Sequence, residues 1–196
     1  EKDKQPWSNV RSTLTTITIG ENVKSIGSYA FEGCTLLTSI DLKNIQTIGS
    51  HAFQSTKITT ITIPNTVTQI GDEAFSFCDS LTTASIGSGV TTIGINPFKA
   101  CSLLTSLTVS TGNKKLKMDD GVLYDNTKTT IYTYLISNTR TVFEIPKTVV
   151  SIKDSAFYKG TNLKIVEIPK STLEIESNSF VSCSSLISIV FYGNKE

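Results

Sequence analysis

The segment ITTITIPNTVTQIGDEAFSFCDS, from Ile58 to Ser80, decides the fold because versions of it recur along the chain. Its IGDEAFSFC portion has five counterparts, which are IGSYAFEGC, IGSHAFQST, IGINPFKAC, IKDSAFYKG and IESNSFVSC. The phenylalanines of the six copies are Phe31, Phe53, Phe75, Phe98, Phe157 and Phe180. Successive phenylalanines are 22 or 23 residues apart, except for the 59 residues from Phe98 to Phe157. A repeat of this length is typical of a solenoid, in which each coil buries its apolar face only against its neighbours.

Each repeat reads as a strand, a turn, a second short extended segment and a compact final turn. Ile61 and Ile63 alternate with threonines, and these β-branched residues favour a strand. Pro64 cannot donate to a strand ladder and therefore ends the strand. The spacing of Phe75 and Cys78 predicts a tight helical turn, of the 3-10 kind, with one face on the core.

Stacked coils place their first strands side by side in one parallel sheet, with neighbouring strands about 4.8 Å apart. The strands that we expect are 14–19, 37–42, 58–63, 81–86, 104–109, 140–145, 163–168 and 186–191. The repeat phenylalanines should then form a single aligned file. We expect one domain over residues 1–196, made of a flank (1–13), repeats (14–109), an insertion (110–139) and further repeats (140–193).

The repeat pattern also resembles a known family. The pattern L-T-x-I-x-I-P-x-x-V-x-x-I-G-x-x-A-F-x-x-C, present as LTTITIGENVKSIGSYAFEGC and ITTITIPNTVTQIGDEAFSFC, is similar to the BspA-like leucine-rich repeats, also called the Treponema pallidum class. The resemblance implies an α/β-type leucine-rich repeat solenoid, with a parallel sheet on one face and short strands and helical turns on the other. It further implies a secreted or surface protein that binds host matrix, host-cell or microbial proteins, or glycans.

The insertion at 110–139 predicts a β-hairpin. DGVLYD, at residues 120–125, matches an insertion that the family often carries. Residues 122–124 and 129–134 read as two strands around a loop at 125–128. Two interpretations of the hairpin tyrosines, Tyr124, Tyr132 and Tyr134, are open. They either form a recognition knob beside neighbouring lysines, or lie half-buried in a cap over the side of the stack.

The residues that usually carry catalysis or metal binding are missing. All four cysteines lie three residues after a repeat phenylalanine, so we expect buried free thiols at Cys34, Cys78, Cys101 and Cys183. A disulfide between Cys78 and Cys101 of adjacent coils is the alternative. The chain has no C-x-x-C pair for zinc, and its only histidine, His51, takes a position that other coils fill with surface residues. We therefore expect a non-enzymatic protein without a cofactor.

Composition narrows the partners further. A net charge of +1 argues against nucleic-acid binding, which normally needs a basic surface. The chain has no apolar run of 18 residues, so we expect no membrane insertion of this segment. It begins EKDKQPW, without a methionine or a hydrophobic signal region, and we expect it to come from a longer precursor.

The outward residues of the predicted strands define the candidate binding surface. They form two rows, Thr16, Ser39, Thr60, Thr83, Ser106, Val142, Ile165 and Ser188, and Thr18, Asp41, Thr62, Ser85, Thr108, Glu144, Glu167 and Val190. The first five coils present hydroxyl groups, which strand preference explains. The last three place Val142, Ile165 and Val190 beside Glu144 and Glu167, a mixture typical of protein interfaces. Ordinary variation or contact with a further coil is the other interpretation.

The final predicted strand, 186–191, lies in a stretch without charge from Ser184 to Gly193. An exposed apolar strand edge favours pairing with another strand. We expect either that further repeats follow it or that it associates end to end with another copy. The sequence thus predicts an extracellular or cell-surface recognition module, with a self-assembling structural protein as the alternative.

Overall fold

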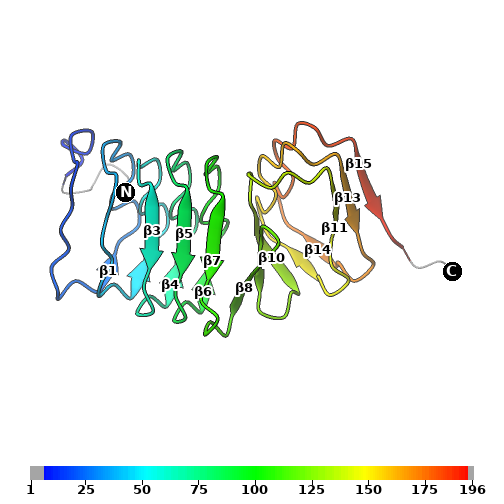
Figure 1. Cartoon of the computed structure of the whole chain (residues 1–196), viewed down its shortest axis with the longest axis horizontal. Coiled ribbons are helices and arrows are strands. Elements are labelled where there is room, and N and C mark those ends of the chain that lie inside the picture. Colours follow the sequence, from blue (N-terminus) through cyan, green and yellow to red (C-terminus); the bar gives the residue numbers. More distant parts are fainter. Residues whose placement is uncertain (1–6, 194–196) are drawn as a thin grey trace. The chain divides into compact units, whose positions relative to one another are not determined.

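The structure is a computed structural model, and it describes residues 7–193 (Figure 1). This part of the chain contains fifteen β-strands and no helix. The chain divides into two compact units, residues 1–115 and 116–196, and the boundary falls within the segment that interrupts the repeats. The expected flank at 1–13 lies partly outside the described residues, and its described part forms turns.

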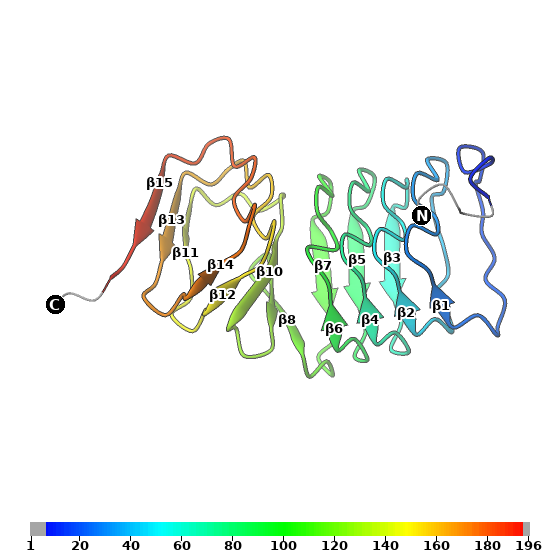
Figure 2. The same ribbon diagram turned by 180° about the vertical axis from the view of Figure 1, so that it is seen from behind.

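The first unit is a stack of coils with a parallel sheet on each side (Figures 1 and 2). One sheet contains the first strand of three coils, and the other contains the second extended segment of four coils. The bounds of the first sheet are β3 (Thr60–Ile63), β5 (Thr83–Ile86) and β7 (Ser106–Val109). Those of the second are β1 (Ser25–Ile26), β2 (Thr47–Ile48), β4 (Gln69–Ile70) and β6 (Thr92–Ile93).

The alternation predicted for the strands is confirmed in β3. Ile61 and Ile63 are buried, whereas Thr60 and Thr62 are exposed. The register aligns Thr60 with Thr83, and Thr83 with Ser106, so equivalent positions lie in rows across the sheet. A strand buries alternate side chains because successive Cβ atoms point to opposite faces of the sheet.

The aromatic side chains form the predicted file in the core of the first unit. Ring centroids are 5.4 Å apart for Phe31 and Phe53, 5.3 Å for Phe53 and Phe75, and 5.5 Å for Phe75 and Phe98, and each pair is stacked. Trp7 extends the file by one ring, with its centroid 5.2 Å from that of Phe31, and its indole N–H donates to the Ala30 carbonyl. No repeat motif surrounds Trp7, and only its spacing of 24 residues from Phe31 is close to the repeat length.

The compact turns around the phenylalanines are not helical, which corrects the prediction of 3-10 turns. In these turns the backbone N–H groups alternate between two directions. Ala52 donates to Gly49 within its own coil, whereas Phe53 donates to the Ala74 carbonyl of the next coil, at 2.7 Å. A helix would direct every N–H along its own axis, so this ladder between coils excludes one.

Residues in the left-handed backbone conformation produce this alternation of N–H directions. In most coils the residues two positions before and two positions after the phenylalanine have positive φ, as at His51 (57°) and Ser55 (59°) around Phe53. A non-glycine residue in this conformation costs roughly 1–2 kcal/mol. The hydrogen bonds between coils offset that cost, since His51 and Ser55 both donate to the following coil.

Two predicted strands, 14–19 and 37–42, are not strands in the structure. The second and third coils start to pair where the Thr59 N–H donates to the Thr38 carbonyl. The strand pairing does not continue beyond this hydrogen bond. The turn from Leu42 to Ile45 is one residue shorter than its equivalent from Ile63 to Val67. Residues 39–43 therefore diverge from β3 and leave a cavity of about 290 Å³ between the two segments.

The second unit contains two sheets of its own. A parallel sheet joins β11 (Val142–Glu144), β13 (Ile165–Ile168) and β15 (Ser188–Phe191) in that order. The other sheet has the order β14-β12-β10-β9-β8 and includes the predicted hairpin. Its strands are β8 (Leu116–Asp119), β9 (Val122–Asp125), β10 (Thr130–Tyr134), β12 (Ser151–Ile152) and β14 (Glu174–Ile175).

The hairpin replaces one coil of the solenoid. β9 pairs antiparallel with β8 and β10, and β10 pairs parallel with β12, as the short strands of ordinary coils do. Tyr134 stacks on Phe157 with ring centroids 5.1 Å apart, and Phe157 stacks on Phe180 at 4.8 Å. The Tyr134 N–H donates to the Ala156 carbonyl, in the manner of the repeat phenylalanines. Tyr134 is therefore the aromatic residue of the coil that the 59-residue gap conceals.

Close approach between coils predicts that Gly71→Ala destabilises the first unit. An added Cβ at Gly71 would lie 2.4 Å from the Ser50 backbone nitrogen, and only backbone atoms surround it. We expect the free energy of unfolding in urea to fall by at least about 2 kcal/mol. Gly27→Ala is the matched control, since its Cβ would meet nothing within 4 Å and should change stability by less than about 0.5 kcal/mol. Equal effects of the two substitutions would contradict the close packing.

Candidate ligand-binding surface

The sheet β11–β13–β15 brings together the outward residues predicted as a partner site. Its register aligns Val142 with Ile165 and Ser188 in one row, and Glu144 with Glu167 and Val190 in the next. Val142 is 43% exposed and Glu144 is exposed, whereas Ile165, Glu167 and Val190 are partly exposed. The structure thus places apolar and acidic side chains in adjacent rows on one face.

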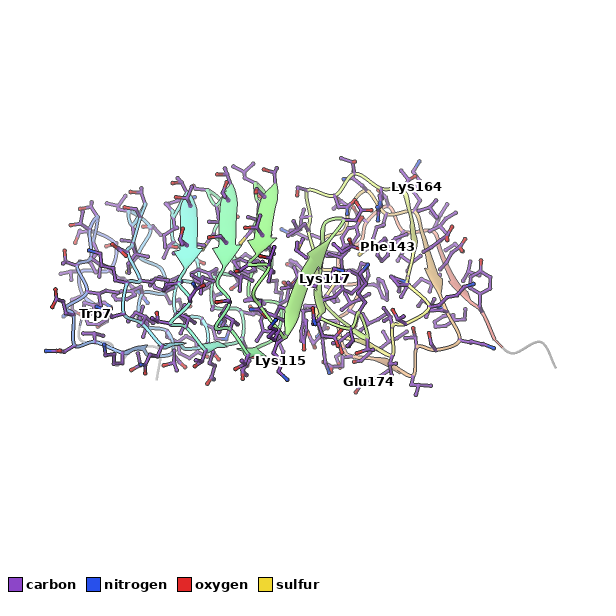
Figure 3. The ribbon with its side chains drawn as sticks, turned by 60° about the horizontal axis from the view of Figure 1, so that its bottom comes forward. Trp7, Lys115, Lys117, Phe143, Lys164 and Glu174 are labelled. Atoms are coloured by element: carbon purple, nitrogen blue, oxygen red, sulfur yellow. The ribbon has the colours of Figure 1, made fainter. Side chains whose placement is uncertain are left out.

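The intervening residues hold this face in place from beneath. Phe143 and Val166 belong to the core of the second unit, where Phe143 contacts Tyr134 and Phe157. Figure 3 shows the side chain of Phe143 within this unit. The ring centroid of Phe143 lies 5.4 Å from that of Tyr134 and 5.7 Å from that of Phe157. Because alternate residues of the same strands are locked in the core, the outward rows have a fixed register.

A pocket of about 640 Å³ lies where this face meets the turns that follow the strands. Its lining residues are Glu144, Lys147, Glu167, Pro169, Lys170, Ser171 and Tyr192. The Tyr192 hydroxyl donates to Glu167 Oε2 at 2.7 Å. This hydrogen bond, together with the charges of Glu167 and Glu144, raises the pKa of Tyr192.

Three lining residues of this pocket, Lys147, Lys170 and Tyr192, were not predicted from the sequence. A signal for the lysines was present, because the successive coils read VFEIPK at 142–147 and IVEIPK at 165–170. Residues at the same repeat position in adjacent coils lie side by side. The duplication therefore places two lysines next to two glutamates. Tyr192 had no repeat counterpart that would have indicated it.

The three hairpin tyrosines do not lie on this surface. Tyr124 and Tyr134 are each 2% exposed and belong to the core of the second unit, and Tyr132 is half-buried on the hairpin. Burial raises the pKa of Tyr132, with a smaller contribution from Asp125. Two of the three side chains therefore have no surface to present to a partner.

Charged residues of the hairpin are occupied by contacts within it. Asp125 accepts hydrogen bonds from the Thr127 and Thr129 hydroxyls, both at 2.6 Å, and from the backbone of Thr129 and Thr130. Burial alone would raise the pKa of Asp125, but these hydrogen bonds outweigh it and the pKa is lowered. Lys128 pairs with Asp119, and Arg140 pairs with Asp120.

The cysteines are free thiols, as predicted, and three of the four are buried. Three of them donate to the phenylalanine carbonyl of the preceding coil: Cys78 to Phe53 (3.2 Å), Cys101 to Phe75 (3.0 Å) and Cys183 to Phe157 (3.1 Å). Burial raises the pKa of Cys34 and of the partly exposed Cys183, so both thiols stay protonated at neutral pH. These thiols therefore serve the packing between coils.

His51 is partly exposed, stacks on Tyr29 with centroids 4.8 Å apart, and shares a 2.7 Å hydrogen bond with Gln54. Residues 7–193 hold no cluster of three or more His, Cys, Asp or Glu residues suited to a metal ion. They also contain no helix able to cross a membrane.

Comparison with known proteins agrees with the geometry. The sequence pattern of the BspA type leucine rich repeat region matches residues 8–129 and 129–196, in six copies. The chain belongs to this family. The BspA-type assignment covers the hairpin coil as well as the regular coils. No curated protein matches the chain.

Several solved structures share the fold of this BspA-type protein. A leucine-rich repeat protein from Eubacterium ventriosum has a TM-score of 0.79 and 23% identity, over 98% of this chain and 64% of its own. The pneumococcal vaccine antigen PcpA has a TM-score of 0.67 and 23% identity, over 87% and 49%. A leucine-rich repeat protein from Bacteroides ovatus has a TM-score of 0.59 and 26% identity, over 92% and 50%. The chain therefore spans less than two thirds of the length of each.

The position of Tyr134 in the aromatic file predicts that its ring matters and its hydroxyl does not. The hydroxyl oxygen is buried and has no hydrogen-bond partner among the described residues. We expect Tyr134→Phe to leave thermal stability unchanged or slightly raised, because an unsatisfied buried polar group is removed. Tyr134→Ala should cost about 3–5 kcal/mol, since it opens a cavity beside Phe157. A large loss of stability in Tyr134→Phe would show that the hydroxyl has a partner.

Proposed function

We propose that this BspA-type protein is an extracellular or cell-surface recognition module that binds host or microbial proteins through the face of β11, β13 and β15. The observation that carries the proposal is the aligned pair of rows on this face, with Val142 and Ile165 beside Glu144 and Glu167. Exposed apolar groups next to charged ones are typical of protein-binding surfaces. Val190 extends the patch onto the third strand.

Family membership supports binding rather than catalysis. Leucine-rich repeat proteins typically serve as binding modules, and the rigid stack presents a broad surface to a partner. PcpA, which shares the fold, is a pneumococcal vaccine antigen, and this supports a location outside the cell. Host matrix proteins and cell-surface proteins are therefore the partners to test.

Ile165→Lys tests the proposed face. The side chain lies on the outward row and is partly exposed, so we expect the thermal unfolding temperature to stay nearly constant. Burying a lysine against an apolar partner should lower binding to immobilised host matrix proteins at least about tenfold. The matched control is Thr83→Lys, an outward position in the first unit, which should bind normally. Normal binding by Ile165→Lys would place the binding site elsewhere.

A second candidate, end-to-end self-assembly, rests on the outer edge of β15. This strand pairs with β13 on one side, and no described strand pairs with its other side. Ile187 is 80% exposed and Phe191 is 64% exposed. Phe191 aligns with Ile168, which is buried. Such an edge can accept a strand from another copy.

Phe191→Lys separates the two candidates. If the edge joins copies of the chain, sedimentation velocity should show assembly that increases with concentration, and the added charge should abolish it. Thr108→Lys, on the outward face of β7, is the control and should assemble like the unmodified chain. A monomer at all concentrations would remove self-assembly and leave recognition as the function.

A further inference from the structure

The pocket next to the candidate face contains charges of both signs, arranged in rows. The repeated EIPK sequence places Glu144 beside Glu167 and sets Lys147 and Lys170 in its lining as a second pair. Neighbouring parallel strands are about 4.8 Å apart, so Glu144 and Glu167 adjoin each other, and the two lysines follow them in the turns after the strands. Like charges placed side by side repel, and an opposite charge bound between them would relieve that repulsion.

The four charged groups do not neutralise one another. Within the described residues, no ion pair joins Glu144 or Glu167 to Lys147 or Lys170, although other ion pairs of the second unit are formed. Glu167 accepts one hydrogen bond from Tyr192, which leaves most of its acceptor capacity open. The pocket thus keeps two carboxylates and two ammonium groups available to a ligand.

One further lining residue of this pocket has a hydroxyl group without a hydrogen-bond partner. The Ser171 hydroxyl oxygen is shielded from solvent and has no hydrogen-bond partner among the described residues. Ser171 is one of the lining residues. Because Ser171 as a whole is only partly buried, rotation of its side chain would bring this hydroxyl to the pocket, where a bound group could complete it. The volume of about 640 Å³ is within the range of ligand pockets.

We propose that this pocket binds a zwitterionic peptide segment of the partner protein. A basic side chain of the segment lies between Glu144 and Glu167, and an acidic side chain of the segment is bound by Lys147 and Lys170. An apolar residue of the same segment packs on the Val142 and Ile165 row, which adjoins the acidic row. This apolar row extends contact beyond the pocket, which favours a peptide over a free amino acid. The proposal rests on the proposed function and specifies the chemistry of its partner.

Labelled synthetic peptides test the proposal directly. The probes are six-residue peptides that carry one Val, one Arg and one Asp, with the two charged residues separated by zero, one or two glycines. Matched peptides replace Arg with Gln, or Asp with Asn. By fluorescence anisotropy, we expect at least one doubly charged peptide to bind about tenfold more tightly than both of its singly charged counterparts. Free arginine and free aspartate should not compete at the same concentration.

Paired substitutions identify the pocket as the place of binding. Glu144→Gln with Glu167→Gln should remove the preference for Arg, and Lys147→Gln with Lys170→Gln should remove the preference for Asp. Lys57→Gln with Asp79→Asn, two exposed charges of the first unit, is the control and should retain both preferences. Tyr192→Phe should weaken binding of the doubly charged peptide less than the glutamate pair does, because it removes only one orienting hydrogen bond.

Three results would overturn the proposal: no binding by any doubly charged peptide, equal binding by singly and doubly charged peptides, or unchanged binding by both paired variants. These outcomes are distinct from failure of the proposed function. If the paired variants still bind matrix proteins and Ile165→Lys does not, the face is the binding surface and the pocket is not part of it. If free amino acids displace the peptides, the pocket binds small zwitterions instead of a segment of protein.

Discussion

The hydrogen bonds between the compact turns of successive coils are the constraint on which the rest of the structure depends. Each turn directs alternate N–H groups at the next coil, and this ladder fixes the separation at which the aromatic rings stack. The left-handed residues and the glycines at 49, 71 and 94 both follow from it, since they permit this backbone path and close approach. In the second unit, Lys153 and Glu176 hold the equivalent positions and pair with each other. A glycine at this repeat position is therefore needed in the first unit, where the backbones of adjacent coils leave no room for a Cβ atom, and not in the second.

The repeat of the sequence was enough to predict the features that depend on repetition. The aromatic file, the inward and outward alternation and the aligned rows all follow from one segment recurring at a nearly constant interval. The helical turns were predicted wrongly because nothing in the sequence marks the left-handed positions. Ordinary residues such as His51, Phe77 and Lys159 occupy them, and each holds this conformation while its N–H donates to a carbonyl of the next coil. A glycine at these positions would have indicated the left-handed conformation, but only one of them, Gly33, is a glycine.

On the candidate surface too, the residues that repeat from coil to coil could be predicted, whereas those without a repeat counterpart could not. The rows of Val142 with Ile165 and of Glu144 with Glu167 could be predicted because register transfers from coil to coil. The pocket could be predicted only in part, since Tyr192 reaches Glu167 from beyond the last strand. Tyr134 was misread for a related reason. It lies 23 residues before Phe157, the ordinary repeat distance, but the surrounding sequence had lost every other mark of a coil.

Separation of core and surface positions explains how one scaffold could acquire a specific site. Outward residues of the strands do not enter the aromatic file, so threonines in the first unit and glutamates in the second are equally compatible with the same stack. The chemistry of the pocket nevertheless depends on the core. A shift of one residue in β11 or β13 would turn Glu144 or Glu167 inward and expose the residues beneath. The buried Phe143 and Val166 prevent that shift, and the packing that stabilises the coils therefore also keeps the two glutamates side by side.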